Sequence, residues 1–100
     1  MSRQTIYWRE RKRKHKRLLI EYMGGRCHIC SYDKNVGSLD FHHVEGKSFG
    51  IGENLNCSMK TLKKEADRTI LVCKNCHYEV HAGMHGKIIK KYTEKLNKSL

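Results

Sequence analysis

Four cysteines in the chain form two pairs, each with two residues between its members. Two such pairs supply four thiolates, which is the number and softness of ligands that a tetrahedral structural zinc ion prefers. The two-residue spacer lets both sulfurs of a pair reach one ion. A shared ion would tie together two distant segments across a folded insert. The sequence therefore predicts a structural Zn²⁺ site made of Cys27, Cys30, Cys73 and Cys76.

Two further cysteine features are weaker evidence for a functional site. Cys73-Lys74-Asn75-Cys76-His77 has the C-x-x-C-H form of a haem attachment site, but a second pair is present to complete a zinc site and no export signal is visible. Paired cysteines in a reducing cytosol are more often metal ligands than disulfides. Cys57 stands alone in a polar segment, so we expect it to remain a free thiol.

Four of the seven histidines occur at spacings that suggest chemistry. His42 and His43 are adjacent at the end of an expected strand, so their side chains should point apart and serve different purposes. His77 and His81 are four residues apart, which places them on one face of an expected helix. An imidazole can bind a divalent ion or accept a proton near neutral pH. The remaining histidines, His15, His28 and His85, show no such pattern and are assigned no role.

Glycines and hydrophobic spacing divide the chain into the elements that must position these residues. A basic helix should be closed by Gly24-Gly25, and a short helix should begin behind Ser58 as its N-cap. A glycine-dotted loop is expected at 46–52. The predicted helices are 5–23, 58–66, 76–82 and 87–96, and the predicted hairpin strands are 38–44 and 69–72.

The 100 residues fit a single domain, with only 38% hydrophobic and 31% charged residues. An apolar core alone would be marginal at this composition, whereas a structural zinc ion can contribute roughly 10 kcal/mol. We expect a basic N-terminal helix at 1–25, a zinc-stapled core at 26–83 and a lysine-rich C-terminal helix at 84–100. The longest aliphatic run, Leu18-Leu19-Ile20, is too short for a membrane span or signal peptide, so we expect a cytoplasmic location.

The net charge of +11 is concentrated at the two ends of the chain. Residues 1–17 carry eight Lys/Arg against one Glu, a balance of +7, and residues 84–100 carry five Lys against one Glu, a balance of +4. The segment 18–83 is neutral, with eight residues of each sign. A polyanionic partner is indicated. Nucleic acid is favoured over a membrane, because neither end alternates basic residues with large apolar anchors.

Taken together, these motifs resemble those of the cysteine-bearing HNH endonucleases. The resemblance lies in Leu39-Asp40-Phe41-His42-His43-Val44 and in Leu71-Val72-Cys73-Lys74-Asn75-Cys76-His77-x-x-x-His81, with Cys27-x-x-Cys30 ahead of them, and it spans about residues 26–82. It implies an α+β fold of the ββα-metal type, in which two antiparallel strands and a helix surround a catalytic ion. The flanking basic helices and the structural zinc site of four cysteines would be added to this unit.

The resemblance also implies roles for individual residues. His42, His77 and His81 would bind the catalytic divalent ion, the helical pair as in the related nuclease colicins, and His43 would be the general base. Asp40 would either orient that base or form a plain salt bridge. Arg68 stands where the family commonly has Asn, and it is a candidate catalytic residue as a phosphate clamp, as is Arg26. None of Asn54, Asn56 and Asn75 can be assigned to the missing Asn.

The expected reaction is the hydrolysis of DNA phosphodiester bonds, by nicking or cutting with low sequence specificity. Three imidazoles suit Mn²⁺, Ni²⁺, Co²⁺ or Zn²⁺ better than Mg²⁺, which prefers oxygen ligands. The basic ends would bind flanking backbone phosphates. We expect a monomer or weak dimer that acts alone or with a phage partner protein. We expect it to be a phage or mobile-element enzyme that works in the cytoplasm of the host cell.

Two other functions are compatible with parts of the sequence. A non-catalytic zinc module that binds nucleic acid would explain the cysteines and the charge, but would leave the four spaced histidines without a purpose. A protein-interaction module of the RING or zinc-ribbon kind would leave the terminal charges of +7 and +4 unexplained. Both remain alternatives to the nuclease.

Overall fold

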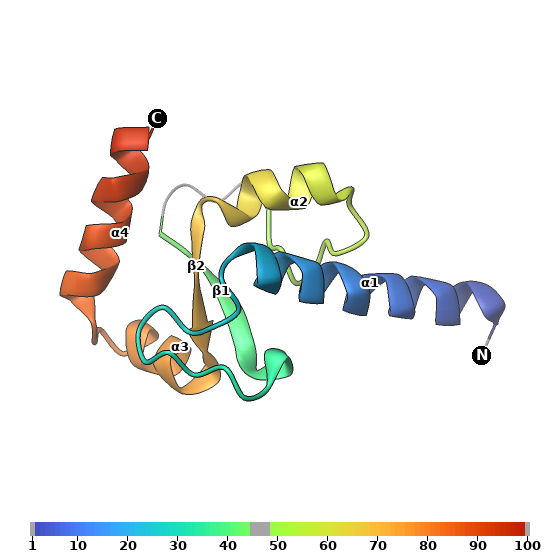
Figure 1. Ribbon diagram of the computed structural model, residues 1–100, viewed down its shortest axis with the longest axis horizontal. Helices are drawn as coiled ribbons and strands as arrows, with labels where there is room; N and C mark the ends of the chain where they lie inside the picture. The colour runs from blue at the N-terminus through green and yellow to red at the C-terminus, as the bar shows by residue number, and fades with distance from the viewer. Residues whose placement is uncertain (1, 45–48, 100) are drawn as a thin grey trace.

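The computed structural model describes residues 2–44 and 49–99 and has a small α+β architecture (Figure 1). The predicted α+β class is thereby confirmed. The predicted loop 46–52 lies partly outside the described residues. The elements in chain order are α1 (Arg3–Tyr22), the 3₁₀ turn η1 (Val36–Ser38), β1 (Leu39–His43), α2 (Met59–Ala66), β2 (Thr69–Cys73), α3 (Lys74–His81) and α4 (Gly86–Ser99).

The two strands pair antiparallel and are joined through α2 rather than by a tight turn. Leu39 lies opposite Cys73, His42 opposite Ile70 and His43 opposite Thr69. Side chains alternate along a strand, so His42 and His43 occupy opposite faces of the sheet. One face of β1 meets α3 and the other meets α2, as the contacts of the two histidines show.

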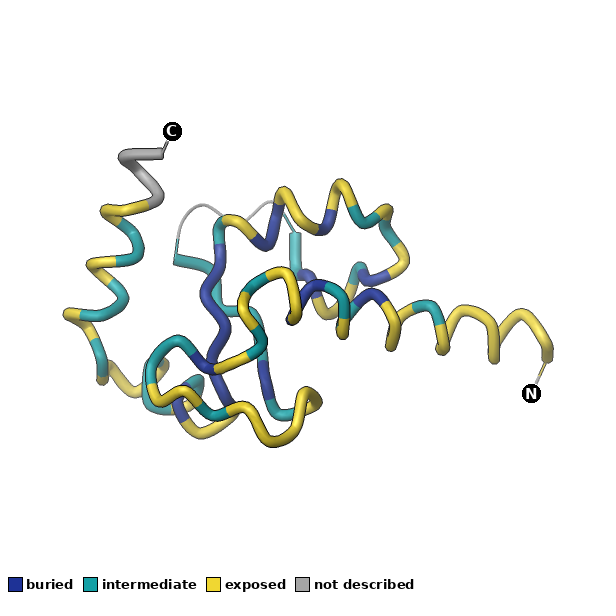
Figure 2. Tube along the Cα trace, in the orientation of Figure 1, coloured by how far each residue is buried: buried dark blue, intermediate teal, exposed yellow. Residues whose placement is uncertain are grey.

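The helix α1 begins two residues before and ends one residue before the predicted bounds of 5–23. Ser2 is its N-cap and accepts a hydrogen bond from the backbone N–H of Thr5, at 3.2 Å. Its end is closed by Gly24 and Gly25, whose φ angles of +105° and +75° suit glycine and disfavour residues with a Cβ. Only the last turns of α1 are buried, through Leu19 and Ile20, and its N-terminal half extends away from the body into solvent (Figures 1 and 2).

Two adjoining clusters of buried side chains form the core. The first packs Ile20 against the strands and three of the cysteines, and every residue of β2 is buried. The second lies between α1 and α2. Its buried members are Leu19, Ile51, Leu55, Leu62 and Ala66. The sheet therefore has its α1–α2 side filled by aliphatic packing, while the cysteines complete the first cluster where an aliphatic core would otherwise be thin.

The outer edge of β2 is covered by the segment around Cys27. The backbone N–H of His28 donates to the Leu71 carbonyl at 2.8 Å, and the backbone N–H of Leu71 donates to Nδ1 of His28 at 3.3 Å. The other ring nitrogen of His28 donates to the Met23 carbonyl at 3.0 Å. His28 therefore fastens the first cysteine pair to the sheet, so it has a structural role.

The closing helix α4 lies on the far side of the sheet from α1 and α2 (Figure 1). Its Tyr92 ring stacks on His28 at a centroid distance of 5.5 Å, and Thr93 Oγ1 donates to the Val44 carbonyl at 3.1 Å. Its basic outer face remains exposed through Lys87, Lys90 and Lys91. Among the described residues, no helix combines the length and the apolar character needed to cross a membrane.

Candidate functional site

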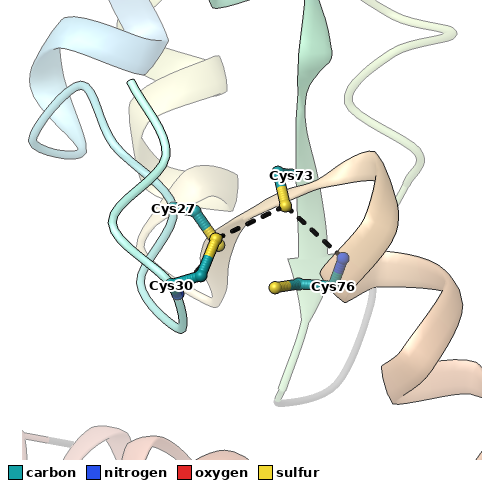
Figure 3. Close-up of side chains that lie close together, drawn as sticks. All are labelled: Cys27, Cys30, Cys73 and Cys76. Carbon is teal, nitrogen blue, oxygen red and sulfur yellow. Dashed lines mark hydrogen bonds between the residues drawn. The ribbon is translucent and has the colours of Figure 1, made fainter. Parts of the chain in front are cut away.

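The two cysteine pairs converge on one point, as the zinc prediction requires. One sulfur from each of Cys27, Cys30, Cys73 and Cys76 lies within 4.8 Å of every other (Figure 3). Cys27, Cys73 and Cys76 are buried, Cys30 is exposed, and the sulfurs of Cys30 and Cys73 are 3.6 Å apart. Four thiols at this separation can hold a zinc ion. The site joins the segment after α1 to the start of α3.

Backbone N–H groups point at the sulfurs within each pair. Those of Ile29 and Cys30 lie 3.4 and 3.5 Å from Cys27 Sγ, and that of Cys76 lies 3.4 Å from Cys73 Sγ. Burial raises the pKa of Cys27, but backbone hydrogen bonds from Cys30, Cys73 and Ile29 outweigh this effect and lower the pKa to about 7. Burial, and then the neighbouring thiols, raise the pKa of Cys76. The pKa of Cys30 is raised as well, so binding a metal ion would require these two thiols to lose their protons.

A second convergence brings together the three histidines predicted as catalytic-metal ligands. His42 comes from β1, and His77 and His81 come from successive turns of α3, with one ligand atom from each within 4.8 Å of the others. The ring centroid of His42 lies 5.5 Å from the centroids of both helical rings, and the Nε2 atoms of His77 and His81 are 3.1 Å apart. This cluster is partly exposed, so an ion held there would be open to solvent and to a ligand.

Asp40 contacts one ring of this cluster, that of His77. Its Oδ2 lies 3.2 Å from Nδ1 of His77, and its Oδ1 accepts from Lys74 Nζ at 3.1 Å. Burial raises the pKa of Asp40, but the hydrogen bonds from Lys74 and His77 outweigh it and lower the net pKa. The ionised carboxylate fixes the hydrogen of His77 on Nδ1 and leaves Nε2 as a ligand atom.

The expectation that Asp40 orients the base His43 is therefore corrected. Asp40 and His43 lie on opposite faces of β1, because they are an odd number of residues apart on the strand. Asp40 instead orients the metal-ligand candidate His77 and pairs with Lys74, so the alternative of a salt bridge is the one that the structure contains.

The partner of His43 is a residue that the sequence did not suggest. Nε2 of His43 lies 2.9 Å from Oε1 of Glu65 on α2. Leu62, Glu65 and Ala66 are all buried, so Glu65 belongs to the apolar stripe of its helix. A charged residue on such a stripe is the one signal that could have marked Glu65, but its partner depends on how α2 packs against the sheet.

The two histidine environments meet at one cavity of about 420 Å³ beside β1. Its lining includes His43 from one face of the strand, and His77 and Asp40 from the other. Lys16 from α1 and Glu53 from the loop before α2 also line this cavity. The structure thus brings the predicted base, one predicted metal ligand and a lysine to a common space.

Arg68 lies at the turn between α2 and β2. Its backbone N–H donates to the Glu65 carbonyl at 3.0 Å, and its carbonyl accepts from the Val44 N–H at 3.0 Å. These bonds place it beside the end of β1 that carries His43. Arg68 and Arg26 are not among the described residues that line the cavity.

Asn54, His15 and His85 each contact a polar group nearby in the fold. Asn54 donates to the Gly50 carbonyl at 2.7 Å and so holds the turn that lines the cavity. His15 donates to the Leu55 carbonyl at 2.6 Å, and His85 lies 3.0 Å from a Glu79 carboxylate oxygen. Cys76, Glu79 and His85 also lie within metal-ligand range of one another, although this group shares Cys76 with the four-cysteine site.

The electrostatics of the three-histidine cluster favour a neutral His42. Partial burial lowers the pKa of His42, and the neighbouring His77 and His81 lower it further because a second positive charge nearby is unfavourable. A neutral imidazole has a lone pair free for a metal ion, so the cluster can accept a cation at neutral pH.

No protein-family model, curated protein or solved structure matches this chain.

Proposed function

We propose that this protein is a metal-dependent endonuclease of the HNH type that hydrolyses DNA phosphodiester bonds with low sequence specificity. The observation that supports it best is the convergence of His42, His77 and His81 beside a cavity that His43 also lines. Of the four histidines, His43 and His77 line that cavity, and each has its own carboxylate partner, Glu65 and Asp40 respectively. A module that only bound nucleic acid would have no use for this arrangement.

The spacing of the two helical rings, His77 and His81, fits a divalent ion. At metal–nitrogen distances of about 2.1 Å, neighbouring ligands of a tetrahedral or octahedral ion are about 3.0 to 3.4 Å apart. The Nε2 atoms of His77 and His81 are 3.1 Å apart, and Asp40 holds His77 in the tautomer that a ligand needs. Bound there, a divalent ion would act as a Lewis acid on the scissile phosphate and its leaving oxygen.

The chain's own residues would supply the proton transfer. His43, unprotonated, accepts a proton from water while the water oxygen forms a bond to phosphorus. The bond between phosphorus and the 3′ oxygen breaks, and that oxygen takes a proton from solvent. Lys16 is the cation placed on the cavity wall, where the phosphate gathers negative charge. A 5′ phosphate and a 3′ hydroxyl result.

The extended half of α1 would bind the DNA backbone away from the cut. Residues 3–12 carry +3 of the +7 balance of residues 1–17, with four Lys/Arg against Glu10, and the described residues up to Glu10 are exposed. Contacts of this kind are made to phosphates and carry little sequence information. The four-cysteine site would hold a structural Zn²⁺ that fixes the start of α3, and with it the two helical histidines.

A plasmid-nicking assay tests the proposal. The wild-type protein with Mn²⁺, Ni²⁺, Co²⁺, Zn²⁺ or Mg²⁺ should convert supercoiled plasmid to open circles, and His43→Ala should lose about 10²- to 10⁴-fold in rate. Tyr78→Ala is the matched control, because Tyr78 is exposed on α3 next to His77. Wild-type protein that shifts DNA in a gel but never nicks it with any of these ions would instead be a non-catalytic zinc module that binds nucleic acid.

A further inference from the structure

Glu65 is a buried carboxylate with a defined neighbour. The side chains of Glu65 and His43 are 5% and 14% exposed, and their Oε1 and Nε2 atoms lie 2.9 Å apart. A carboxylate on the apolar face of a helix is costly unless it is paired and hydrogen-bonded. The hydrogen bond with His43 meets this requirement, and it determines which nitrogen of the imidazole is left to accept a proton.

The contact fixes which nitrogen of His43 carries the hydrogen. An ionised carboxylate can only accept, so Nε2–H donates and Nδ1 keeps its lone pair. The ring also lines the cavity shared with His77 and Asp40. Nδ1 is therefore the nitrogen left to accept a proton from a water molecule.

The backbone around Glu65 holds this geometry in place. The Glu65 carbonyl accepts from the Arg68 N–H at 3.0 Å, and Thr69 Oγ1 donates to the Ala66 carbonyl at 2.7 Å. Thr69 is in turn the residue paired with His43 across the two strands. The turn from α2 into β2 thus sets Glu65 at a constant position relative to His43.

We propose that Glu65 is a positioning residue that holds His43 as the Nε2–H tautomer, with Nδ1 presented as the general base. This inference rests on the nuclease function proposed above. It gives the two carboxylates of the site separate roles: Asp40 orients the metal-ligand candidate His77, and Glu65 orients the base. Glu65 would also support the base in a chain that has Arg68 at the position where the HNH family commonly has Asn.

The first test is spectroscopic and does not depend on catalysis. The ¹⁵N shifts of the His43 ring should report a dominant Nε2–H tautomer in the wild-type protein and in Glu65→Gln, whose amide oxygen can still accept. Glu65→Ala should give a mixture of the two tautomers. Asp67→Asn is the matched control, since it removes one negative charge at the end of the same helix, where Asp67 accepts from Tyr22. A mainly Nδ1–H ring in the wild type, or no change in Glu65→Ala, would overturn the inference.

The second test is kinetic. Glu65→Ala should lower the nicking rate by about 10- to 100-fold, with Glu65→Gln intermediate, because the base itself contributes about 10²- to 10⁴-fold. In the His43→Ala background, Glu65→Ala should add no further loss, since it acts through that ring. An additional loss there contradicts the assignment. If the wild type nicks DNA and Glu65→Ala nicks equally well, this inference alone fails; if the wild type never nicks, the proposed function fails with it.

Zinc content and thermal unfolding of each variant show whether the fold is kept. Should Glu65→Ala not fold, Glu65→Gln carries the test, because it keeps the size of the side chain and removes only its charge. Its nicking rate should then fall below that of Asp67→Asn while its His43 ring remains Nε2–H. Equal rates for these two variants would count against Glu65 as a positioning residue.

Discussion

Nδ1 of His77 and Oδ2 of Asp40 are 3.2 Å apart, which joins a residue on β1 to the helix that follows β2. The same carboxylate also accepts from Lys74. Since Lys74 and His77 are both on α3, Asp40 fixes the rotation of this helix relative to the strand. This contact helps to orient His77 toward His42.

Replacing Asp40 should therefore weaken metal binding at the three-histidine cluster. Carboxylates behind a metal-bound histidine are typically worth about 10- to 100-fold in metal affinity or activity. We expect Asp40→Asn to raise the dissociation constant for Mn²⁺ or Ni²⁺ by about that factor, as measured by calorimetric titration of the zinc-loaded protein. Asp33→Asn, an exposed position in the loop before η1, is the control. Unchanged affinity in Asp40→Asn would show that His77 needs no support.

Removing one cysteine of the four-cysteine site should unfold much of the domain. Zinc binding at such sites contributes roughly 10 kcal/mol in small domains, and Cys27 is part of the first core cluster. Cys27→Ser should lose its zinc and its cooperative thermal transition, as followed by metal analysis and circular dichroism. Cys57→Ser should keep both, because Cys57 lies outside the site. A stable, zinc-free Cys27→Ser protein would show that zinc does not hold this fold.

The stability of the protein without an ion at the histidine cluster should decrease in acid. Burial, and then the neighbouring histidines, lower the pKa of His42 in the folded state below its usual 6.5. The unfolded chain therefore binds the proton more readily, and the free energy of unfolding falls as pH drops below about 6.5. Urea unfolding of the zinc-loaded protein at pH 7.5 and at pH 5.5 measures this. His42→Gln should show a smaller decrease between the two pH values.

Neutralising the exposed half of α1 should weaken DNA binding evenly across sequences. Arg9, Lys12 and Arg13 are exposed on this helix. Each phosphate contact contributes about 0.9 to the slope of log affinity against log salt concentration. The triple variant to Gln should reduce that slope by about 2 to 3 in fluorescence anisotropy with two unrelated duplexes. A loss confined to one duplex would indicate base recognition instead.

Much of this structure could be predicted from local patterns. The two cysteine pairs, the glycine end of α1, the Ser58 N-cap and the strand composition all involve neighbouring residues, and the elements appear within a few residues of the expected ranges. The convergence of His42 with His77 and His81 also follows from simple periodicity, once the strand is placed beside the helix.

The partners of the two acidic residues could not be predicted in the same way. Asp40 is close in sequence to His43, but side chains alternate along a strand, so Asp40 lies on the opposite face of β1 and contacts His77. Glu65 reaches His43 across 22 positions, through the packing of α2. Sequence proximity left both roles of Asp40 open, because only the three-dimensional arrangement of α2 and α3 around the sheet decides which carboxylate contacts which histidine.

Ligand candidates for both sites lie on one short helix. Cys73 caps α3, Cys76 is in its first turn, and His77 and His81 follow directly. If both sites bind cations as proposed, an ion at the cysteine site would help to order the helix that carries His77 and His81. Each ion would then raise the affinity for the other, and removing zinc should also weaken binding of the second ion.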